Sequence, residues 1–284
     1  MTEFFADLPR FEFLQNAVMA CVLAGLACGV MGSYVVTRRI SSVAGAIAHS
    51  ILGGLGAARY CQVVLGWTWF TPMTGAVLMA LASALVISWV RVALREREDT
   101  VIQAVWAVGM AIGLLFIFKT PGYNEDLMSY LFGSILMVTQ RDLWVMAGLD
   151  VMLLVVCVPL YSRMVAVCFD EEFAVTRGID VQLNHLLMIC LVALTVVLLV
   201  SVAGIVMVIA LLTLPAATAS HFSGRLWHMM VLSGVLTAVL SIAGMAVSYE
   251  PDLPVGAVII VLAACVYILV VITARARGIR GMRA

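Results

Sequence analysis

The segment Ser42-Val-Ala-Gly-Ala-Ile-Ala-His-Ser-Ile-Leu-Gly-Gly-Leu-Gly-Ala-Ala-Arg59 decides how the rest of the chain is interpreted. An α-helix over this segment would advance about 100° per residue and would separate small side chains from large aliphatic ones. Small residues four apart allow helices to pack closely in lipid, so the small face should meet protein. That face holds Gly45, His49, Gly53 and Gly54. A titratable side chain inside a membrane bundle, such as this histidine, is a candidate functional residue.

The composition indicates an integral membrane protein. Of the 284 residues, 64% are hydrophobic and 11% are charged, whereas a soluble domain is about 25% charged. Long apolar runs favour an all-α bundle over a β-barrel, whose strands would alternate. The net charge is zero and there is no basic stripe, so no nucleic-acid partner is expected. The seven cysteines are scattered singly, which predicts buried apolar positions rather than a disulfide or metal framework.

A membrane-spanning helix needs about 20 apolar residues, which predicts eight or nine spans in a single domain over 1–284. The run from His185 to Ala219 would form a helix of about 52 Å, too long for a core of about 30 Å, so we expect a break at Ser201–Gly204. Pro215 should kink the second half of this run. Residues 127–139 are too short to cross and predict a re-entrant or interfacial helix. The predicted spans are 14–36, 43–63, 71–90, 101–118, 143–162, 185–201, 203–219, 227–247 and 254–273.

The arginines predict how the chain is oriented. In the nine-span arrangement most of them fall on one side, which the positive-inside rule makes cytoplasmic. The N-terminus should then lie outside and the C-terminus inside, with Lys119 as the main basic exception. Three histidines at predicted span ends are interpreted as interfacial: His185, His221 and His228. The arginines on the cytoplasmic side are Arg38, Arg39, Arg91, Arg95, Arg97, Arg163, Arg177, Arg225, Arg275, Arg277, Arg280 and Arg283.

The longest polar interruption, residues 169–178, predicts a short helix outside the membrane. An aspartate can cap its start, two glutamates suit its positive N-terminal end, an arginine suits its other end, and a glycine can stop it. Two phenylalanines four apart would present an aromatic face. The helix could rest on the lipid surface, but its acids would be repelled by an anionic leaflet, which favours a partner groove. These residues are Phe169, Asp170, Glu171, Glu172, Phe173, Arg177 and Gly178.

The chain has no nucleotide-binding motif of its own. A Walker A loop requires Gly-x-x-x-x-Gly-Lys-Ser/Thr. Lys119 is followed by Thr120 but preceded by Phe118, so the motif is absent. If the protein is a pump, its ATPase must be a separate subunit, and a docking helix without a nucleotide site suits that arrangement.

Five blocks along the chain, in order, resemble the zinc/manganese/iron class of ABC transporter permeases. The resemblance implies a dimeric permease of the bacterial inner membrane, homomeric or heteromeric, with two cytoplasmic ATPase subunits and a periplasmic or lipoprotein metal-binding protein. It also implies that residues 169–178 are the coupling helix and that His49 lies at the metal pathway. No permanently bound cofactor is implied, and the transported ion is the substrate. The blocks are Gly32-Ser-Tyr-Val-Val-Thr-Arg-Arg-Ile40, Ala48-His-Ser50, Asp126-Leu-Met-Ser-Tyr-Leu-Phe-Gly-Ser134, Phe169-Asp-Glu-Glu-Phe-Ala174 and Leu214-Pro-Ala-Ala-Thr-Ala219.

One position departs from the family pattern. The family commonly has an aspartate one turn before the histidine, where this chain has Gly45. Imidazole without a carboxylate favours zinc, while manganese and iron stay open. Asp150 and Asp252 are further candidates for the metal pathway, because the first lies within a predicted span and the second in an outer loop. A place near the interface for the first, and a merely solvated loop for the second, are the alternative interpretations.

Other functions remain to be distinguished. A permease for iron chelates or cobalamin would need a wide cavity, which the small-residue face could line. An intramembrane enzyme is a different class, but the chain has neither His-Glu-x-x-His nor a serine-protease motif. A secondary carrier would usually have more ionisable groups inside its spans. The prediction is therefore a non-catalytic translocation subunit, with Gly45, Gly53, Gly54 and Pro215 serving helix packing or gating.

Overall fold

The computed structural model describes residues 2–93, 98–121, 133, 135–251 and 253–276. The described part of the chain is mostly helical and contains no strand. Eight of its helices are long and apolar enough to cross a membrane, which confirms the expected polytopic bundle. The elements are α1 (Thr2–Asp7), α2 (Glu12–Thr37), α3 (Ser41–Val64), α4 (Pro72–Ala93), α5 (Glu98–Lys119), η1 (Ile135–Met137), α7 (Gln140–Phe169), α8 (Glu171–Thr176), α9 (Val181–Ala203), α10 (Ile205–Ser220), α11 (Leu226–Tyr249) and α12 (Val255–Ala276).

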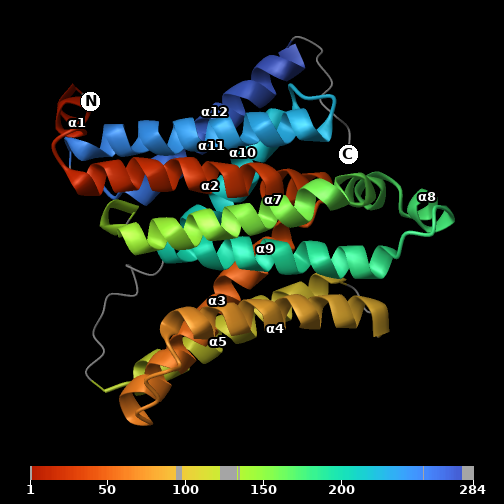
Figure 1. The fold of residues 1–284 in the computed structure, drawn as a ribbon, viewed down its shortest axis with the longest axis horizontal. Coiled ribbons are helices and arrows are strands. Elements are labelled where there is room, and N and C mark those ends of the chain that lie inside the picture. Colours follow the sequence, from red (N-terminus) through yellow and green to blue (C-terminus); the bar gives the residue numbers. More distant parts are fainter. Residues whose placement is uncertain (1, 94–97, 122–132, 134, 252, 277–284) are drawn as a thin grey trace.

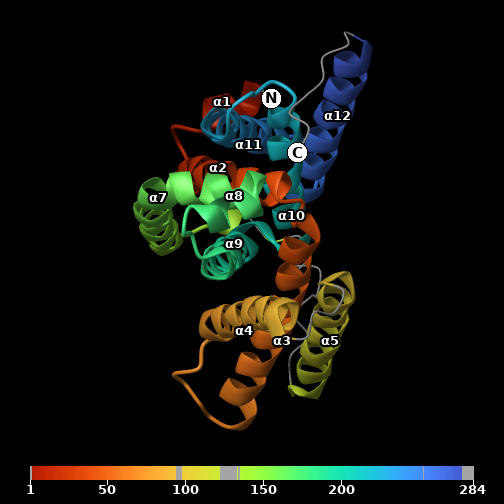
Figure 2. The same cartoon turned by 90° about the vertical axis from the view of Figure 1, so that its right-hand side faces the viewer.

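The spanning helices form two groups, which Figure 2 separates. One group is α3, α4 and α5, and the other is α2, α7 and α9 to α12, with the short α10 packed against α2, α9, α11 and α12. α4 and α3 connect the groups by packing against α9. Figure 1 shows α1 at one end of the long axis and α8 at the other. We refer to these as the α1 end and the α8 end.

Glycines set the close packing of α3 on its neighbours. A Cβ at Gly54 would overlap the backbone carbonyl of Gly75 on α4. A Cβ at Gly53 would lie 2.9 Å from the carbonyl oxygen of Gly109, and one at Gly56 would lie 2.6 Å from that of Gly113, both on α5. Because such contacts are with backbone, only residues without a side chain allow this approach.

Replacing Gly54 with alanine is therefore expected to destabilise the bundle. The new methyl group cannot be accommodated by a side-chain rotation, and overpacking of this kind costs about 1–3 kcal/mol. Gly45→Ala is the matched control on the same helix, since its Cβ would meet only the Trp106 and Ile209 side chains at 3.7 and 3.8 Å. Thermal unfolding of the purified protein in detergent should show a lower midpoint for Gly54→Ala alone. Equal midpoints for the two variants would contradict the packing account.

The helix limits follow the sequence in one place and differ from it in another. Gly204, with φ of 79°, separates α9 from α10, which confirms the predicted break. Pro215 is buried inside α10, which has 16 residues. The predicted span 143–162 ends too early, because α7 continues to Phe169. No glycine or proline follows Arg163 within the helix, and Asp170 is the first residue to leave helical geometry.

The predicted helix at 127–139 lies mostly outside the described residues. Its described part contains η1, a single 3-10 turn, followed by the start of α7. Thr139 caps α7 through a reciprocal pair of hydrogen bonds with Asp142. Gly133 packs directly against the backbone of Ala203 and Gly204. The chain at this residue therefore contacts the break between α9 and α10.

Candidate functional site

His49 lies two turns into α3 and is half-buried. Its imidazole stacks on the Trp106 indole of α5, with ring centroids 4.5 Å apart and planes inclined by 12°. The same indole lies beside Gly45, where an added Cβ would be 3.7 Å from its Cζ3 atom. A tryptophan therefore flanks both the histidine and the position where the family commonly has a carboxylate.

A groove on the surface of α3 and α5 continues from this pair. It encloses about 510 Å³ and is lined by Leu52, Gln103, Trp106, Ala107, Met110, Ala111 and Leu114. Gln103 is exposed, although it lies within a spanning helix. Sequence reasoning missed both Gln103 and Trp106. A signal was available, because tryptophan normally gathers at membrane interfaces and Trp106 lies well inside its span.

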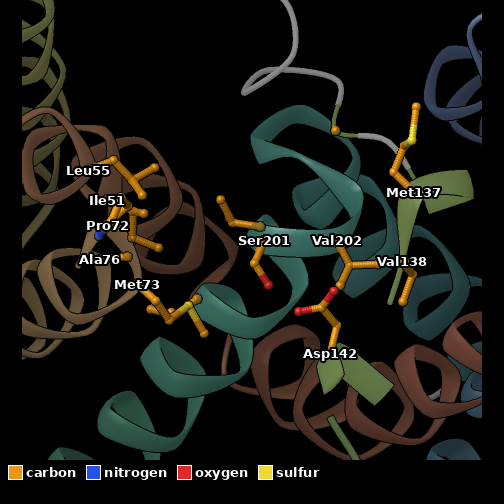
Figure 3. A pocket seen from close by; sticks show the side chains of 13 residues that line it. Ile51, Leu55, Pro72, Met73, Ala76, Met137, Val138, Asp142, Ser201 and Val202 are labelled. Atoms are coloured by element: carbon orange, nitrogen blue, oxygen red, sulfur yellow. The ribbon is translucent and has the colours of Figure 1, made fainter. Parts of the chain in front are cut away.

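A separate cavity of about 340 Å³ lies toward the α1 end (Figure 3). α3 contributes Ile51 and Leu55 from its aliphatic face, and His49 is not among the lining residues. Figure 3 shows Asp142 and Ser201 among the side chains of this cavity. Oδ2 of Asp142 accepts hydrogen bonds from the Thr139 hydroxyl at 2.7 Å and from the Thr139 backbone N–H at 3.0 Å. The carboxylate is therefore part of the cap of α7.

Of the two other predicted acidic residues, Asp150 alone lies in the described part of the chain. Asp150 is 3% exposed within α7, and neither of its carboxylate oxygens has a hydrogen-bond partner among the described residues. The predicted partner is therefore absent among the described residues, and the alternative that Asp150 lines a wet cavity stays a prediction. Asp252 lies outside the described residues. The described part of the chain holds no cluster of three or more His, Cys, Asp or Glu side chains that could bind a metal.

The predicted short helix is present as α8, which projects beyond the bundle in Figure 1. Oδ1 of Asp170 accepts a hydrogen bond from the N–H of Phe173 at 2.9 Å, which caps its start. Arg177 is its C-cap, and Gly178 follows with φ of 72°. Phe169 and Phe173 are 50% and 47% exposed. The Arg177 guanidinium lies 5.1 Å from the centroid of the Phe173 ring. The predicted cap and stop of the short helix are confirmed. Phe169 is the last residue of α7, so the two exposed phenylalanines do not share one face of a single helix as predicted.

Four charged or polar side chains meet where α8 joins the bundle. Nη2 of Arg38 donates to Oε1 of Glu171 at 2.7 Å, and Nη2 of Arg91 donates to the same oxygen at 3.2 Å. Nη1 of Arg91 lies 2.8 Å from Nε2 of His185, and Nη2 of Arg38 lies 3.3 Å from its Nδ1. We call Arg38, Arg91, Glu171 and His185 the charge cluster. His185 is buried between the two arginines in the first turns of α9, and its interpretation as a residue at the membrane interface stays a prediction.

The charge cluster keeps Glu171 ionised. Burial alone would raise the pKa of this carboxyl, but the hydrogen bond and charge of Arg38, together with Arg91, lower the pKa below its usual value. The stabilisation from these ion pairs is therefore present above the ordinary glutamate pKa. It is lost only as the pH falls through the lowered value in the folded protein.

Comparisons with known proteins give the chain a family. Residues 10–274 match the ABC 3 transport family. A manganese transport system membrane protein, MntC of Halalkalibacterium halodurans, is 32% identical over 289 residues, covering 100% of this chain and 97% of that protein. A probable metal transport system membrane protein of Chlamydia pneumoniae is 39% identical over 243 residues, 86% and 83% of the two chains. A solved structure of PsaBC from Streptococcus pneumoniae with a Fab has a TM-score of 0.83 at 28% identity, covering 95% and 94%. The chain belongs to the ABC 3 transport family.

Proposed function

We propose that the chain is the permease subunit of an ATP-driven importer of divalent metal ions, with manganese as its main substrate. The observation that carries this proposal is the similarity to a manganese transport membrane protein, which extends over the whole chain. Imidazole alone favours zinc, but the relatives favour manganese, so we propose zinc and iron only as competing ions. The chain supplies a path and does no covalent chemistry.

The α8 end is proposed to be the cytoplasmic side, with α8 docked on a separate ATPase. Five helix ends or connections bring arginines to that end, as the positive-inside rule requires. The exposed side chains of Phe169, just before α8, and Phe173, on α8, are suitable anchors, because aromatic side chains dominate binding energy at protein interfaces. The α1 end would then receive metal from an external binding protein. The arginines at the α8 end include Arg38, Arg39, Arg91, Arg163, Arg177 and Arg225, and the basic residues at the α1 end are Arg10, Arg59, Lys119 and Arg141.

A second permease copy is proposed to cover the groove on α3 and α5. An exposed amide such as that of Gln103 is unfavourable against acyl chains, so this face should line a polar path or meet protein. His49 lies beside that groove, and the described residues give it no cluster of ligands that could hold a metal ion. Facing copies would place two histidines along one shared path, which supports His49 as a pathway residue.

Metal uptake by the assembled transporter tests the proposal. The permease, its ATPase and its external binding protein would be reconstituted in vesicles and supplied with free manganese, free zinc or an iron chelate. We expect ATP-dependent accumulation of manganese, with zinc acting as a competitor. Uptake of the chelate alone, or manganese uptake that is independent of ATP, would contradict the proposed function.

A further inference from the structure

The antiparallel pair α4 and α9 differs at its two ends. At the α1 end, the cavity of about 340 Å³ lies between the first turns of α4, including Met73 and Ala76, and the last turns of α9, including Val200 and Ser201. At the α8 end, the last turn of α4 is held to the first turns of α9 through Arg91 and His185, as described above. The two helices therefore border one cavity at the α1 end, and at the α8 end the contact between Arg91 and His185 ties them beside a second cavity.

Glu171 connects this tie to the rest of the molecule. Its single Oε1 atom accepts from Arg91 of the α3–α5 group and from Arg38 at the end of α2 in the other group. Nη1 of Arg38 also donates to the backbone carbonyl of Val167 on α7 at 2.8 Å. One carboxylate oxygen thus joins α8, α2 and α4, and it does so across the boundary between the two helix groups.

The contact is more than an ordinary surface ion pair. Exposed pairs contribute little to stability, but the Arg38 side chain is only 10% exposed, so its charge depends on a nearby partner. The two glutamates that follow Asp170, the cap of α8, differ in their contacts. Glu172, next to Glu171 on α8, is exposed and makes no ion pair with any described residue. The acidic run therefore contains one residue that ties helices together and one that does not.

We propose that Glu171 is a clasp that holds α4 to α2 and α8 and so fixes α4 against the first turns of α9 at the α8 end. A cavity of about 540 Å³, lined in part by Arg91, Glu171, Val181 and His185, borders the clasp. A displacement of α8 would therefore act directly on Arg91 and on α4. This last step rests on the proposed docking of an ATPase on α8, whereas the clasp itself does not.

Hydrogen–deuterium exchange of the purified permease in lipid nanodiscs tests the clasp without any partner. Glu171→Gln keeps the shape of the side chain and removes its charge, and Glu172→Gln is the matched control. We expect amide exchange in the last turns of α4 and the first turns of α9 to become roughly tenfold faster in Glu171→Gln, the scale for loss of a charge-assisted contact. The control should exchange like the wild type. Equal exchange in the two variants would overturn the proposal.

Arg91→Gln breaks the same contact from α4 and covers the case in which Glu171→Gln folds poorly. It should speed exchange in the same peptides. The double variant should be affected by less than the sum of the two single variants, since both changes remove the contact between Glu171 and Arg91. Additive effects would overturn the clasp.

The transport assay separates this inference from the proposed function. In the reconstituted complex, Glu171→Gln should lower the metal transported per ATP hydrolysed by at least about threefold while leaving the ATPase bound, because a tie between α8 and α4 is weakened. Loss of ATPase binding without altered exchange in α4 would overturn the clasp and make Glu171 a docking contact only. If the wild-type complex transports no metal, the proposed function fails, and exchange alone then decides the clasp.

Discussion

Phe173→Asp is expected to separate the permease from its ATPase. Phe173 is half-exposed on the outward face of α8, and a carboxylate there would be buried in the interface without a partner. Loss of an aromatic anchor costs about 2–4 kcal/mol of binding, or roughly 30- to 1000-fold in affinity. The fold should be unaffected, because the hydrogen bond that caps α8 uses the backbone N–H of residue 173 and an acid in the first turn suits the helix dipole.

Co-purification in detergent measures this loss. Phe173→Leu keeps an apolar side chain at the same place and should retain most of the bound ATPase. Thermal unfolding of the permease alone should be the same for both variants. A stoichiometric complex with Phe173→Asp would show that α8 does not dock an ATPase.

His49→Ala is expected to abolish most metal uptake while the complex stays assembled. Changes to residues that only support a metal ligand lower affinity or activity about 10- to 100-fold, so removal of a ligand should cost at least as much. The alanine also leaves the Trp106 indole without its stacked partner, but it introduces no clash on α3. Uptake of manganese into vesicles at limiting metal concentration measures the effect.

His228→Ala serves as the matched control for this prediction. His228 is exposed at the start of α11, where it contacts Trp227, and it lies far from α3 and α5 in sequence. Its removal should leave uptake unchanged. Wild-type uptake by His49→Ala would remove the imidazole from the pathway, and the groove beside Gln103 would then need another explanation.

Features that depend on neighbouring residues could be predicted from the sequence. Asp170, Gly178 and Gly204 each act through their own backbone or through a hydrogen bond to a residue nearby in the chain, so the limits of α8 and the α9–α10 break follow directly. The small-residue face of α3 could also be predicted, since its periodicity is a property of one helix.

Features that depend on residues far apart in the chain could not be predicted from the sequence. Glu171 and Arg38 are separated by 133 positions, and their contact exists only because α8 starts where α2 ends. The stacking of His49 on Trp106 requires the register between α3 and α5, which glycine contacts set. Asp150 shows the converse, because a buried acid led to the expectation of a partner that the described residues do not supply.

The glycine contacts of α3 have a mechanical consequence. At Gly53, Gly54 and Gly56 the backbone of α3 contacts the backbones of α4 and α5 directly. No side chain there could rotate to let α4 or α5 slide along α3. These three helices should therefore move as one rigid body, and a large rearrangement of the permease should occur where that body packs against α9 and α10. A substitution that loosens the packing of α3, α4 and α5 should therefore reduce how much of a movement at one end of these helices is transmitted to the other end.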